Sequence, residues 1–438
     1  MIKKKQIPIS KSIGKKYQLV KGMKDILPEE QPFWSWVKNT IEKVAEEYGY
    51  QKIDTPILEN TNLFIRSVGE DTDIVSKEMY SFIDKGGENL TLRPEGTAGV
   101  ARAYNEHGMV NLPQPVKLFY YGQMFRYDKP QAGRFRQFYQ FGFESLGEAE
   151  SILDAQQILI GYKIFQRCGI NTSIQINSIG CEECRPIYQN LLTDYFKNIK
   201  NQLCEDCKKR LTKNPLKILD CKEKKCQELM TNLPQTVDNL CDNCHSHFVK
   251  VLEYLDELEV PYILNSRIVR GLNYYTRTTF EFWESEEEEG RQNALGGGGR
   301  YDKLIELLGG RPTPAVGFAV GIERLITKMH DSDFTPPKSP IPDVFLAQLG
   351  NEARKKSLKL FEELKKAGFK VAESFAKNGI KPQLDFANRL GVKYSLILGQ
   401  KEILDGTILI RDMDGGIQEI INYEKIIPEL EKRLGKKQ

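Results

Sequence analysis

Polar side chains recur at two-residue spacing in two neighbouring runs of β-forming residues. Gln140 and Glu144 flank Gly142, so the three would share one face of a strand, with the glycine leaving room between two polar groups. Gly122 and Arg126 form a similar row on the preceding run. A hairpin of these strands would present an arginine, a glutamine and a glutamate to one cavity, which favours a small polar ligand over an exposed polar sheet face.

A turn earlier in the chain carries further polar groups. Glu95, Gly96 and Thr97 follow Pro94 at the end of a short β run. Proline and glycine shape such a turn, and a carboxylate held there can bind an ammonium group. We therefore expect Glu95 and Thr97 to contribute to a polar binding site.

Three segments in the second half of the chain combine glycine with arginine. Arg270–Tyr275 sets a cation beside a glycine and two aromatic hydroxyls, and such arginines commonly bind phosphate. The glycine run in Leu295–Asp302, ahead of a helix expected over Tyr301–Leu308, lacks the Lys-Ser/Thr of a P-loop. Close approach of the backbone to a ligand explains this run better. Arg324 stands at the start of a helix that follows a strand of small residues.

The chain has nine cysteines, and eight of them form close pairs within one stretch. These eight are Cys181, Cys184, Cys204, Cys207, Cys221, Cys226, Cys241 and Cys244. Such clustering favours metal binding over disulfide bonds, and the spacing suits one or two structural Zn²⁺ sites. Buried, reduced cysteine pairs are the alternative. His245 and His247 are further candidate ligands, although a solvated histidine pair is the commoner outcome.

The pattern of apolar residues predicts elements that can position these groups. Apolar side chains at helical spacing predict an amphipathic helix over Glu30–Tyr48. The β runs beyond it are joined by hairpins and predict an antiparallel sheet, with an exposed polar loop over Tyr127–Arg136. The expected fold class is α+β, an antiparallel sheet flanked by helices.

Changes in composition divide the chain into parts. Residues 1–20 form a basic arm, and residues 21–330 form the main domain, interrupted by a helical, cysteine-rich insertion at 180–261. Four prolines within 331–342 predict a linker. Strands and helices then alternate over 343–438, as in an open α/β domain.

Length and composition exclude several classes of protein. With 438 residues, 40% of them hydrophobic, the chain can bury a large core and is neither a mini-protein nor disordered. No apolar run reaches the ~18 residues of a membrane span, and the basic start is not followed by a signal core. We expect a soluble, cytoplasmic protein without a membrane partner. Eight lysines and no acidic residue in residues 1–24 make that arm a candidate nucleic-acid contact or a solvated leader.

Taken in order, these segments resemble the histidyl-tRNA synthetases, a family of class II aminoacyl-tRNA synthetases. Tyr50–Gly69 is similar to the first class II motif, Phe125–Gly142 to the second and Gly317–Leu325 to the third. Arg270–Tyr275 and Gly297–Asp302 resemble the two stretches particular to the histidine enzymes. Two positions depart from the pattern, since Asn273 stands where the family often has Asp and Gln123 where Pro is frequent.

The resemblance implies activation of L-histidine by ATP with Mg²⁺, transfer to tRNA(His), a homodimer, and a C-terminal anticodon-binding domain. It assigns the catalytic roles at the α-phosphate to Arg126 and Arg270. It assigns histidine binding to Glu95, Gly96, Thr97, Arg126, Gln140, Glu144, Arg270, Tyr274 and Tyr275. It assigns ATP to Arg126, Arg134 and Arg324, and the tRNA acceptor end to Gln131.

Two other functions compete with this one. A synthetase-like histidine sensor, a regulatory subunit of histidine biosynthesis, would keep the fold, but such relatives usually lose phosphate-binding arginines and the C-terminal domain. Here Arg126, Arg270 and Arg324 are all present. A zinc-dependent nucleic-acid-binding protein would explain the cysteines but not the glycine and arginine segments.

Overall fold

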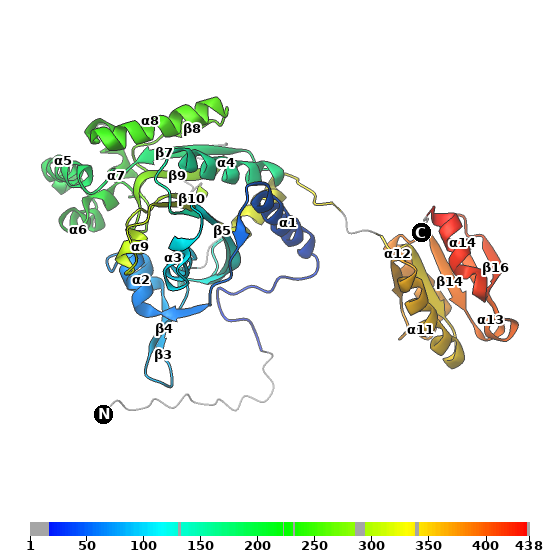
Figure 1. The fold of residues 1–438 in the computed structure, drawn as a ribbon. Helices are drawn as coiled ribbons and strands as arrows, with labels where there is room; N and C mark the ends of the chain where they lie inside the picture. The colour runs from blue at the N-terminus through cyan, green and yellow to red at the C-terminus, as the bar shows by residue number, and fades with distance from the viewer. Residues whose placement is uncertain are drawn as a thin grey trace. The chain divides into compact units, whose positions relative to one another are not determined.

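The computed structural model describes residues 17–129, 133–221, 223–230, 233–284, 294–337 and 341–435. The chain forms two compact units, Met1–Pro337 and Lys338–Gln438. The boundary between them along the chain falls within 331–342, the proline-rich segment that the sequence analysis interprets as a linker. None of the described helices is both long and apolar enough to cross a membrane. Figure 1 shows both units, which are described separately below.

An eight-stranded, mostly antiparallel sheet forms the centre of the first unit (Figure 1). Its strands, in spatial order, are β1 (Gln51–Lys52), β5 (Val116–Phe125), β6 (Gln137–Leu146), β11 (Ala315–Gly321), β10 (Ala294–Arg300), β9 (Thr276–Glu284), β7 (Thr172–Ser178) and β8 (Tyr262–Leu264). The two edge pairs, β1 with β5 and β7 with β8, are parallel. The predicted hairpin is β5 and β6, in which Gly122 lies opposite Gln140.

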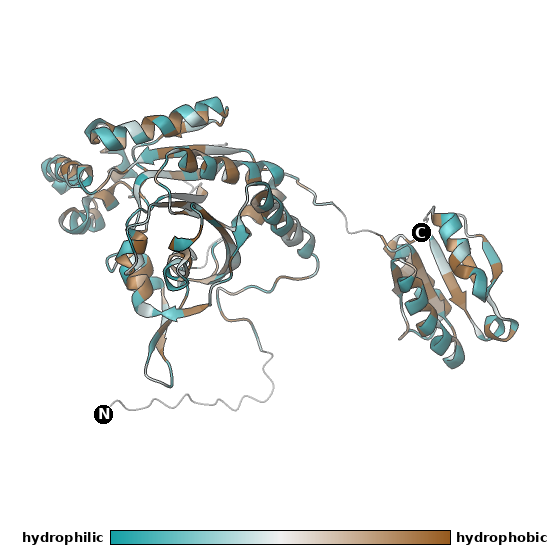
Figure 2. Ribbon diagram, viewed as in Figure 1, coloured by the Kyte–Doolittle hydropathy of each residue, from teal (hydrophilic) through white to brown (hydrophobic). Residues whose placement is uncertain are grey.

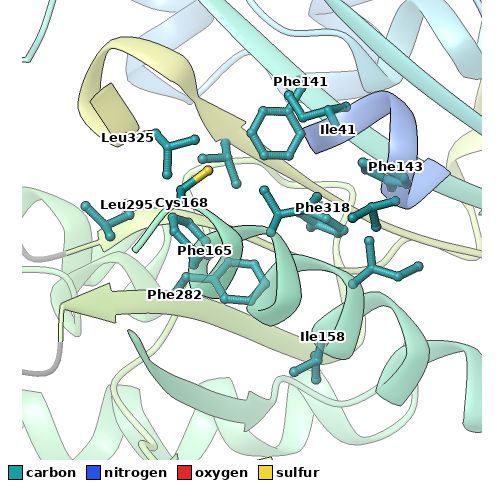
Figure 3. Packing of buried hydrophobic residues seen from close by; sticks show 14 of the residues in the cluster. Ile41, Phe141, Phe143, Ile158, Phe165, Cys168, Phe282, Leu295, Phe318 and Leu325 are labelled. Carbon is teal, nitrogen blue, oxygen red and sulfur yellow. The ribbon is translucent and has the colours of Figure 1, made fainter. Parts of the chain in front are cut away.

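Apolar helices cover one face of this sheet and form the main core. They are α1 (Gln31–Glu47), α4 (Ile152–Arg167) and α10 (Ile322–Asp331). Phe143 and Phe318 stack across neighbouring strands with ring centroids 5.4 Å apart, and Phe141 and Phe282 meet Phe318 edge to face. Figure 3 shows these rings packed with Ile41, Ile158 and Leu325. The sheet is therefore anchored by burial of large apolar side chains.

A small second sheet precedes the Glu95–Thr97 turn in the chain. It has the order β2 (Leu58–Asn60), β4 (Asn89–Leu92) and β3 (Tyr80–Ile83), with helices α2 (Thr61–Val68) and α3 (Thr97–Glu106) following β2 and β4 in the chain. The run Asn89–Leu92 pairs with β2 and β3 in this separate sheet. The chain reverses through the Glu95–Thr97 turn before entering α3.

The cysteine-rich insertion consists of short helices around its own core. Its α-helices are α5 (Cys184–Asn198), α6 (Glu205–Lys213), α7 (Lys224–Glu228) and α8 (Asp242–Glu257). Tyr188, Leu192 and Phe196 of α5 pack on Leu211 and Ile218, together with buried cysteines. Helix α8 instead packs on α4 and joins the main core through Phe248, Val251 and Leu255.

The second unit is an α/β domain with a five-stranded sheet. Its strand order is β13 (Val371–Glu373), β12 (Val344–Gln348), β14 (Tyr394–Leu398), β15 (Thr407–Asp412) and β16 (Gln418–Asn422). Its helices are α11 (Asn351–Lys366), α12 (Ile380–Leu390), α13 (Gln400–Asp405) and α14 (Ile426–Leu434). In Figure 2 the central strands are largely hydrophobic, while the helices carry both colours, as amphipathic helices do.

The predicted α+β class is confirmed, and two local expectations change. The helix expected over Tyr301–Leu308 is only the single turn α9 (Leu304–Leu307). The glycine run is strand β10, in which a Cβ at Gly298 would stand 2.0 Å from the carbonyl oxygen of Gly317. Contact with neighbouring strands, rather than a ligand alone, therefore requires glycine there.

Candidate active site

A cavity of about 1270 Å³ opens in the first unit and gathers most of the predicted residues. Those that line it are Glu95, Thr97, Arg126, Arg134, Gln140, Arg270, Tyr274, Tyr275 and Arg324. They come from strands, helix starts and loops, and together they span more than 200 positions of the chain, from Glu95 to Arg324. Among the predicted residues that the structure describes, Gly96 and Glu144 do not line it. Gln131 lies outside the described residues.

Glu95 is fixed by the start of helix α3. Its two carboxylate oxygens accept hydrogen bonds from the backbone N–H groups of Thr97 (2.7 Å) and Ala98 (2.8 Å). These amides would otherwise lack partners at the helix start. Burial raises the pKa of Glu95, although the two amides oppose that shift. A cationic amino group at this end of the cavity would favour the ionised carboxylate.

Glu144 lies just behind the cavity wall and holds two hydroxyl groups. One carboxylate oxygen accepts from the Thr97 hydroxyl at 2.7 Å, and the other accepts from the Tyr301 hydroxyl. Burial raises the pKa of Glu144 to about 8. A Cβ on Gly317 of the adjacent strand would stand 1.7 Å from this carboxylate, so glycine is needed there. Tyr301 was not among the predicted site residues, although it stands two residues after the glycine run.

Gln140 and the tyrosine pair line the same end of the cavity. The Tyr120 hydroxyl donates to Oε1 of Gln140 at 3.3 Å, from the opposite strand of the hairpin. Tyr274 lies 4.7 Å from Tyr275 and 5.6 Å from Tyr301, measured between ring centroids. Aromatic faces and hydroxyl groups at this end suit a planar ring that carries polar nitrogens.

Arg126 and Arg270 approach the cavity from different elements. Arg126 follows β5, donates its Nε–H to the carbonyl oxygen of Pro94 at 2.8 Å, and lies 5.4 Å from the Phe138 ring centroid. Arg270 precedes β9 and forms an ion pair with Glu281 of that strand. The Nε–H of Arg270 is buried without a hydrogen-bond partner in the described structure. Each guanidinium is anchored yet keeps N–H groups that a phosphate could use.

Two further arginines lie near Arg126. Arg324 of α10 donates to the carbonyl oxygen of Ala294 at 2.6 Å. Arg134 pairs with Asp128 at 2.9 Å. All three arginines line the same cavity. Burial lowers the pKa of Arg324, and the charges of Arg134 and Arg126 add to that effect. Such a group attracts a polyanion.

Glu281 and Glu323 are among the cavity carboxylates that the sequence analysis missed. Glu281 pairs with Arg270 and also accepts from Nε1 of Trp283 at 2.9 Å. Glu323, next to Arg324, accepts from the backbone N–H of Tyr139 at 2.9 Å, and burial raises its pKa to about 7. In the sequence, only the alternation of the strand around Glu281 and the position of Glu323 at a helix start could have pointed to them. Exposed residues without a role show the same patterns.

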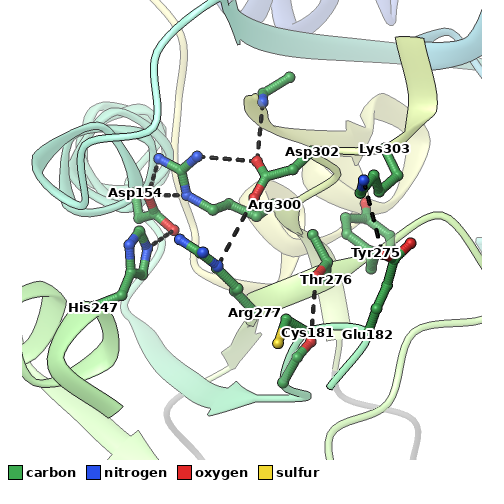
Figure 4. A network of polar contacts seen from close by, with 12 residues as sticks. Asp154, Cys181, Glu182, His247, Tyr275, Thr276, Arg277, Arg300, Asp302 and Lys303 are labelled. Atoms are coloured by element: carbon green, nitrogen blue, oxygen red, sulfur yellow. Dashed lines mark hydrogen bonds and ion pairs between the residues drawn. The ribbon is translucent and has the colours of Figure 1, made fainter. Parts of the chain in front are cut away.

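A buried charge network supports the far side of strand β10. Arg300, fully buried, donates to Asp154 of α4 at 2.8 Å and to Asp302 at 3.1 Å (Figure 4). His247 of the insertion meets the same Asp154 carboxylate at 3.3 Å. Burial alone would raise the pKa of Asp154, but Arg300 and His247 hold it below its usual range. His247 is thus a buried structural partner rather than part of a solvated pair.

The eight clustered cysteines form two groups of four. Cys181, Cys184, Cys241 and Cys244 make one group, called group I, and Cys204, Cys207, Cys221 and Cys226 make the other, called group II. Within each group all sulfur atoms lie within 4.8 Å of one another. The distances between hydrogen-bonded pairs of sulfur atoms are 3.5 to 3.8 Å. A tetrahedral Zn²⁺ with Zn–S bonds of ~2.3 Å would separate its sulfurs by about 3.8 Å. The cysteines are free thiols, and the groups could hold a metal ion.

Comparison with known proteins agrees with this geometry. The family model for histidyl-tRNA synthetase matches residues 22–325, and the anticodon-binding domain model matches residues 343–433. The chain belongs to the histidyl-tRNA synthetase family. The histidine–tRNA ligase of Dehalococcoides mccartyi is 49% identical over 95% of this chain and 100% of its own length. That of Pelotomaculum thermopropionicum is 44% identical over 95% and 98%.

A solved structure of the same family has the same architecture. The apo histidyl-tRNA synthetase of S. aureus superposes with a TM-score of 0.78 at 34% identity. The superposition covers 95% of this chain and 100% of that one. Members of this synthetase family use ATP. The negative charge of its triphosphate matches the positive charge of the arginine-rich end of the cavity.

Proposed function

We propose that this chain is a histidine–tRNA ligase. It would activate L-histidine with ATP to histidyl-adenylate and pyrophosphate, and transfer the histidyl group to the 3′ end of tRNA(His). The observation that carries the proposal is the convergence of Glu95, Thr97 and Gln140 with Arg126, Arg270 and Arg324 on one cavity, in a chain that belongs to this family.

In the first step the histidine carboxylate oxygen attacks the α-phosphorus of ATP, and the bond to the pyrophosphate oxygen breaks. Arg126 and Arg270 would stabilise the charge that develops on the α-phosphate, because both are anchored before the substrate arrives. Arg134 and Arg324 would bind the remainder of ATP. In the second step a hydroxyl of the terminal tRNA ribose attacks the acyl carbon, and AMP leaves.

At the other end of the cavity, Glu95, Thr97 and Gln140 would bind the α-amino group, and Tyr274 and Tyr275 the imidazole. Glu144 would act from behind the wall, where it orients the Thr97 hydroxyl and Tyr301. A site whose buried polar groups stay unpaired with a wrong amino acid can discriminate by roughly 10⁴-fold. Histidine selection would then need no editing step.

Mg²⁺ would enter with ATP, since this ion is usually held by substrate phosphates and one or two carboxylates. Glu281 and Glu323 line the cavity and offer suitable oxygen ligands. When bound, the ion would supply positive charge to the phosphates.

Groups I and II would each hold one structural Zn²⁺, because four thiols at tetrahedral spacing are a typical closed zinc site. Metal analysis of the purified protein should find about two zinc ions per chain. Less than about 0.2 zinc per chain would reject this part of the proposal.

The proposed partners are tRNA(His) and a second copy of the chain. The C-terminal unit, matched by the anticodon-binding model, would contact the anticodon. The segment that resembles the first class II motif and the small sheet expose Ile57, Leu58, Phe82 and Ile83, which suits a homodimer interface. Light scattering of the purified protein tests the dimer.

ATP–pyrophosphate exchange with each of the twenty amino acids tests the activity. Exchange with histidine alone supports the proposed function. Histidine binding without exchange would instead support the histidine-sensing regulatory subunit. Exchange with a different amino acid would overturn the assignment of the imidazole-binding residues.

A further inference from the structure

The insertion contacts the segment Asn273–Arg277, which carries the two cavity tyrosines, directly through Gly180 and Arg185 and indirectly through Lys217. At its root, the backbone N–H of Arg277 donates to the carbonyl oxygen of Gly180 at 2.9 Å, and Ile179 N–H donates back to Arg277 at 2.8 Å. The Thr276 hydroxyl also donates to Gly180, at 3.2 Å. Figure 4 shows Tyr275 and Thr276 beside Cys181 and Glu182. The residue before the first cysteine of group I therefore pairs with this segment.

Arg185 is the side chain that joins group I to the tyrosine pair. It follows Cys184 directly, and its backbone N–H donates to the carbonyl oxygen of Cys181 at 2.9 Å. Its guanidinium donates to the carbonyl oxygen of Tyr275 at 2.5 Å. Its Nε–H is buried without a hydrogen-bond partner in the described part of the chain. Four thiolates around a divalent ion carry a formal charge of about −2, which the adjacent guanidinium would offset.

A second contact comes from the loop between the cysteine pairs of group II. Lys217, between Cys207 and Cys221, donates to the backbone oxygen of Asp71 at 2.6 Å and pairs with its carboxylate at 3.1 Å. The same carboxylate accepts from Nδ2 of Asn273 at 2.6 Å. This explains the departure at position 273, because an aspartate there would face Asp71 with a like charge.

The two contacts act at different residues of the segment that carries the tyrosines. Arg185 holds the backbone at Tyr275, and the Lys217–Asp71 pair holds Asn273, next to Tyr274. The arginines assigned to ATP and its α-phosphate are held otherwise. Arg324 bonds to Ala294 and Arg134 to Asp128. Arg126 bonds to Pro94, and Arg270 pairs with Glu281. Loss of either contact should therefore move the tyrosines and leave the ATP end in place.

We propose that the insertion, braced by its two cysteine groups, clamps Asn273–Arg277 and thereby sets the affinity for histidine. Arg185 and Lys217 are its positioning residues. The inference rests on the proposed function, because it assigns the tyrosine end of the cavity to histidine. It adds a role for the insertion, which lies outside the three class II motifs.

Three variants test the clamp: Arg185→Met, Lys217→Met and the control Lys208→Met. Lys208 lies in the same insertion and pairs with Glu205 at 2.8 Å, but contacts no cavity residue among its reported partners. The measurements are histidine binding by calorimetry, the KM values for histidine and ATP in pyrophosphate exchange, and zinc per chain.

Arg185→Met should weaken histidine binding about tenfold and Lys217→Met about threefold, because each removes a hydrogen bond from a charged donor. KM for ATP, kcat and zinc content should stay within twofold of wild type, and Lys208→Met should change nothing. Arg185→Lys keeps a cationic donor and should recover part of the affinity. General destabilisation of the protein would weaken the binding of both histidine and ATP, so a loss of affinity for histidine alone points to the clamp.

Unchanged histidine affinity in both variants would overturn the clamp, as would a parallel rise of both KM values. If Arg185→Met does not fold, Lys217→Met decides, since its ion pair is partly exposed. Failure of the wild-type protein to exchange with histidine would instead refute the proposed function, so the two failures are distinguishable.

Discussion

The catalytic sheet and the cysteine-rich insertion position polar groups by different physical means. In the sheet, Phe143 and Phe318 stack within a continuous core, and strand register places Glu144 opposite Gly317. In the insertion, helices α6 and α7 are nine and five residues long and surround group II. Helices of that length are marginal in water, so we expect the insertion to depend on metal binding more than the sheet does.

This difference shows that one polar site can be held both by the apolar core of the sheet and by the cysteine-rich insertion. The two regions should respond differently to mutation and to loss of metal. Glu95 and Glu144 depend on apolar packing and on backbone amides or hydroxyls. The carbonyl oxygen of Tyr275 in addition accepts from Arg185, which lies next to group I. Changes to the core should affect stability broadly, and changes to the insertion should act on one end of the cavity.

Removal of metal should have the largest effect and should separate the two regions. A structural Zn²⁺ contributes an apparent ~10–16 kcal/mol in zinc-finger peptides. A strong chelator should therefore abolish hydrogen-exchange protection in α6 and α7, while β6 and β11 keep theirs. The same chelator saturated with zinc is the control. Equal protection of the insertion with and without the chelator would mean that its core suffices without metal.

Truncation of a core ring should come next in size. Phe318→Ala should lower the free energy of unfolding of the first unit by about 3–5 kcal/mol, since the ring is fully buried against Phe143. Leu307→Ala, at a side chain that is 49% exposed, is the control. Calorimetry of both variants measures the difference. A loss below about 1 kcal/mol would show that the core re-packs around the gap.

Arg270→Ala tests a residue at the boundary of the two regions. It should slow adenylate formation by on the order of 10²-fold or more, because a preorganised cation at the developing charge is lost. Arg311→Ala, an exposed arginine, should leave the rate unchanged. Pre-steady-state adenylate formation is the readout. A rate equal to wild type would remove Arg270 from the catalytic residues.

The pH dependence of stability tests the burial of Glu144. Its pKa is raised from 4.5 to about 8 in the folded protein, so the native state binds more protons than the unfolded state between these values. Stability should therefore fall as the pH rises, by about 2 kcal/mol between pH 6 and 8 from this group. Glu144→Gln should remove that part of the slope in thermal unfolding of the first unit. An identical slope in both proteins would contradict a buried carboxyl group that stays neutral.

Much of the site could be predicted from spacing and residue type. The alternation around Gly142 predicts the shared face of Gln140 and Glu144, and the β5–β6 hairpin has the register that this requires. The proline-rich segment marks the place where the two units meet. Glu281, Glu323 and Tyr301 could not be identified because their roles come from partners far away in the chain. His247 likewise acquires its role from Asp154 of another helix.

By itself, the sequence determined the α+β class, the order of the motifs and the clustering of eight cysteines, because periodicity and local spacing are properties of neighbouring residues. Only the tertiary structure decided which cysteines group together, that Glu144 stands behind Thr97, and that Arg185 meets Tyr275. The Glu144–Thr97 and Arg185–Tyr275 contacts join residues 47 and 90 positions apart. Their geometry depends on how strands and helices pack, which no local pattern encodes.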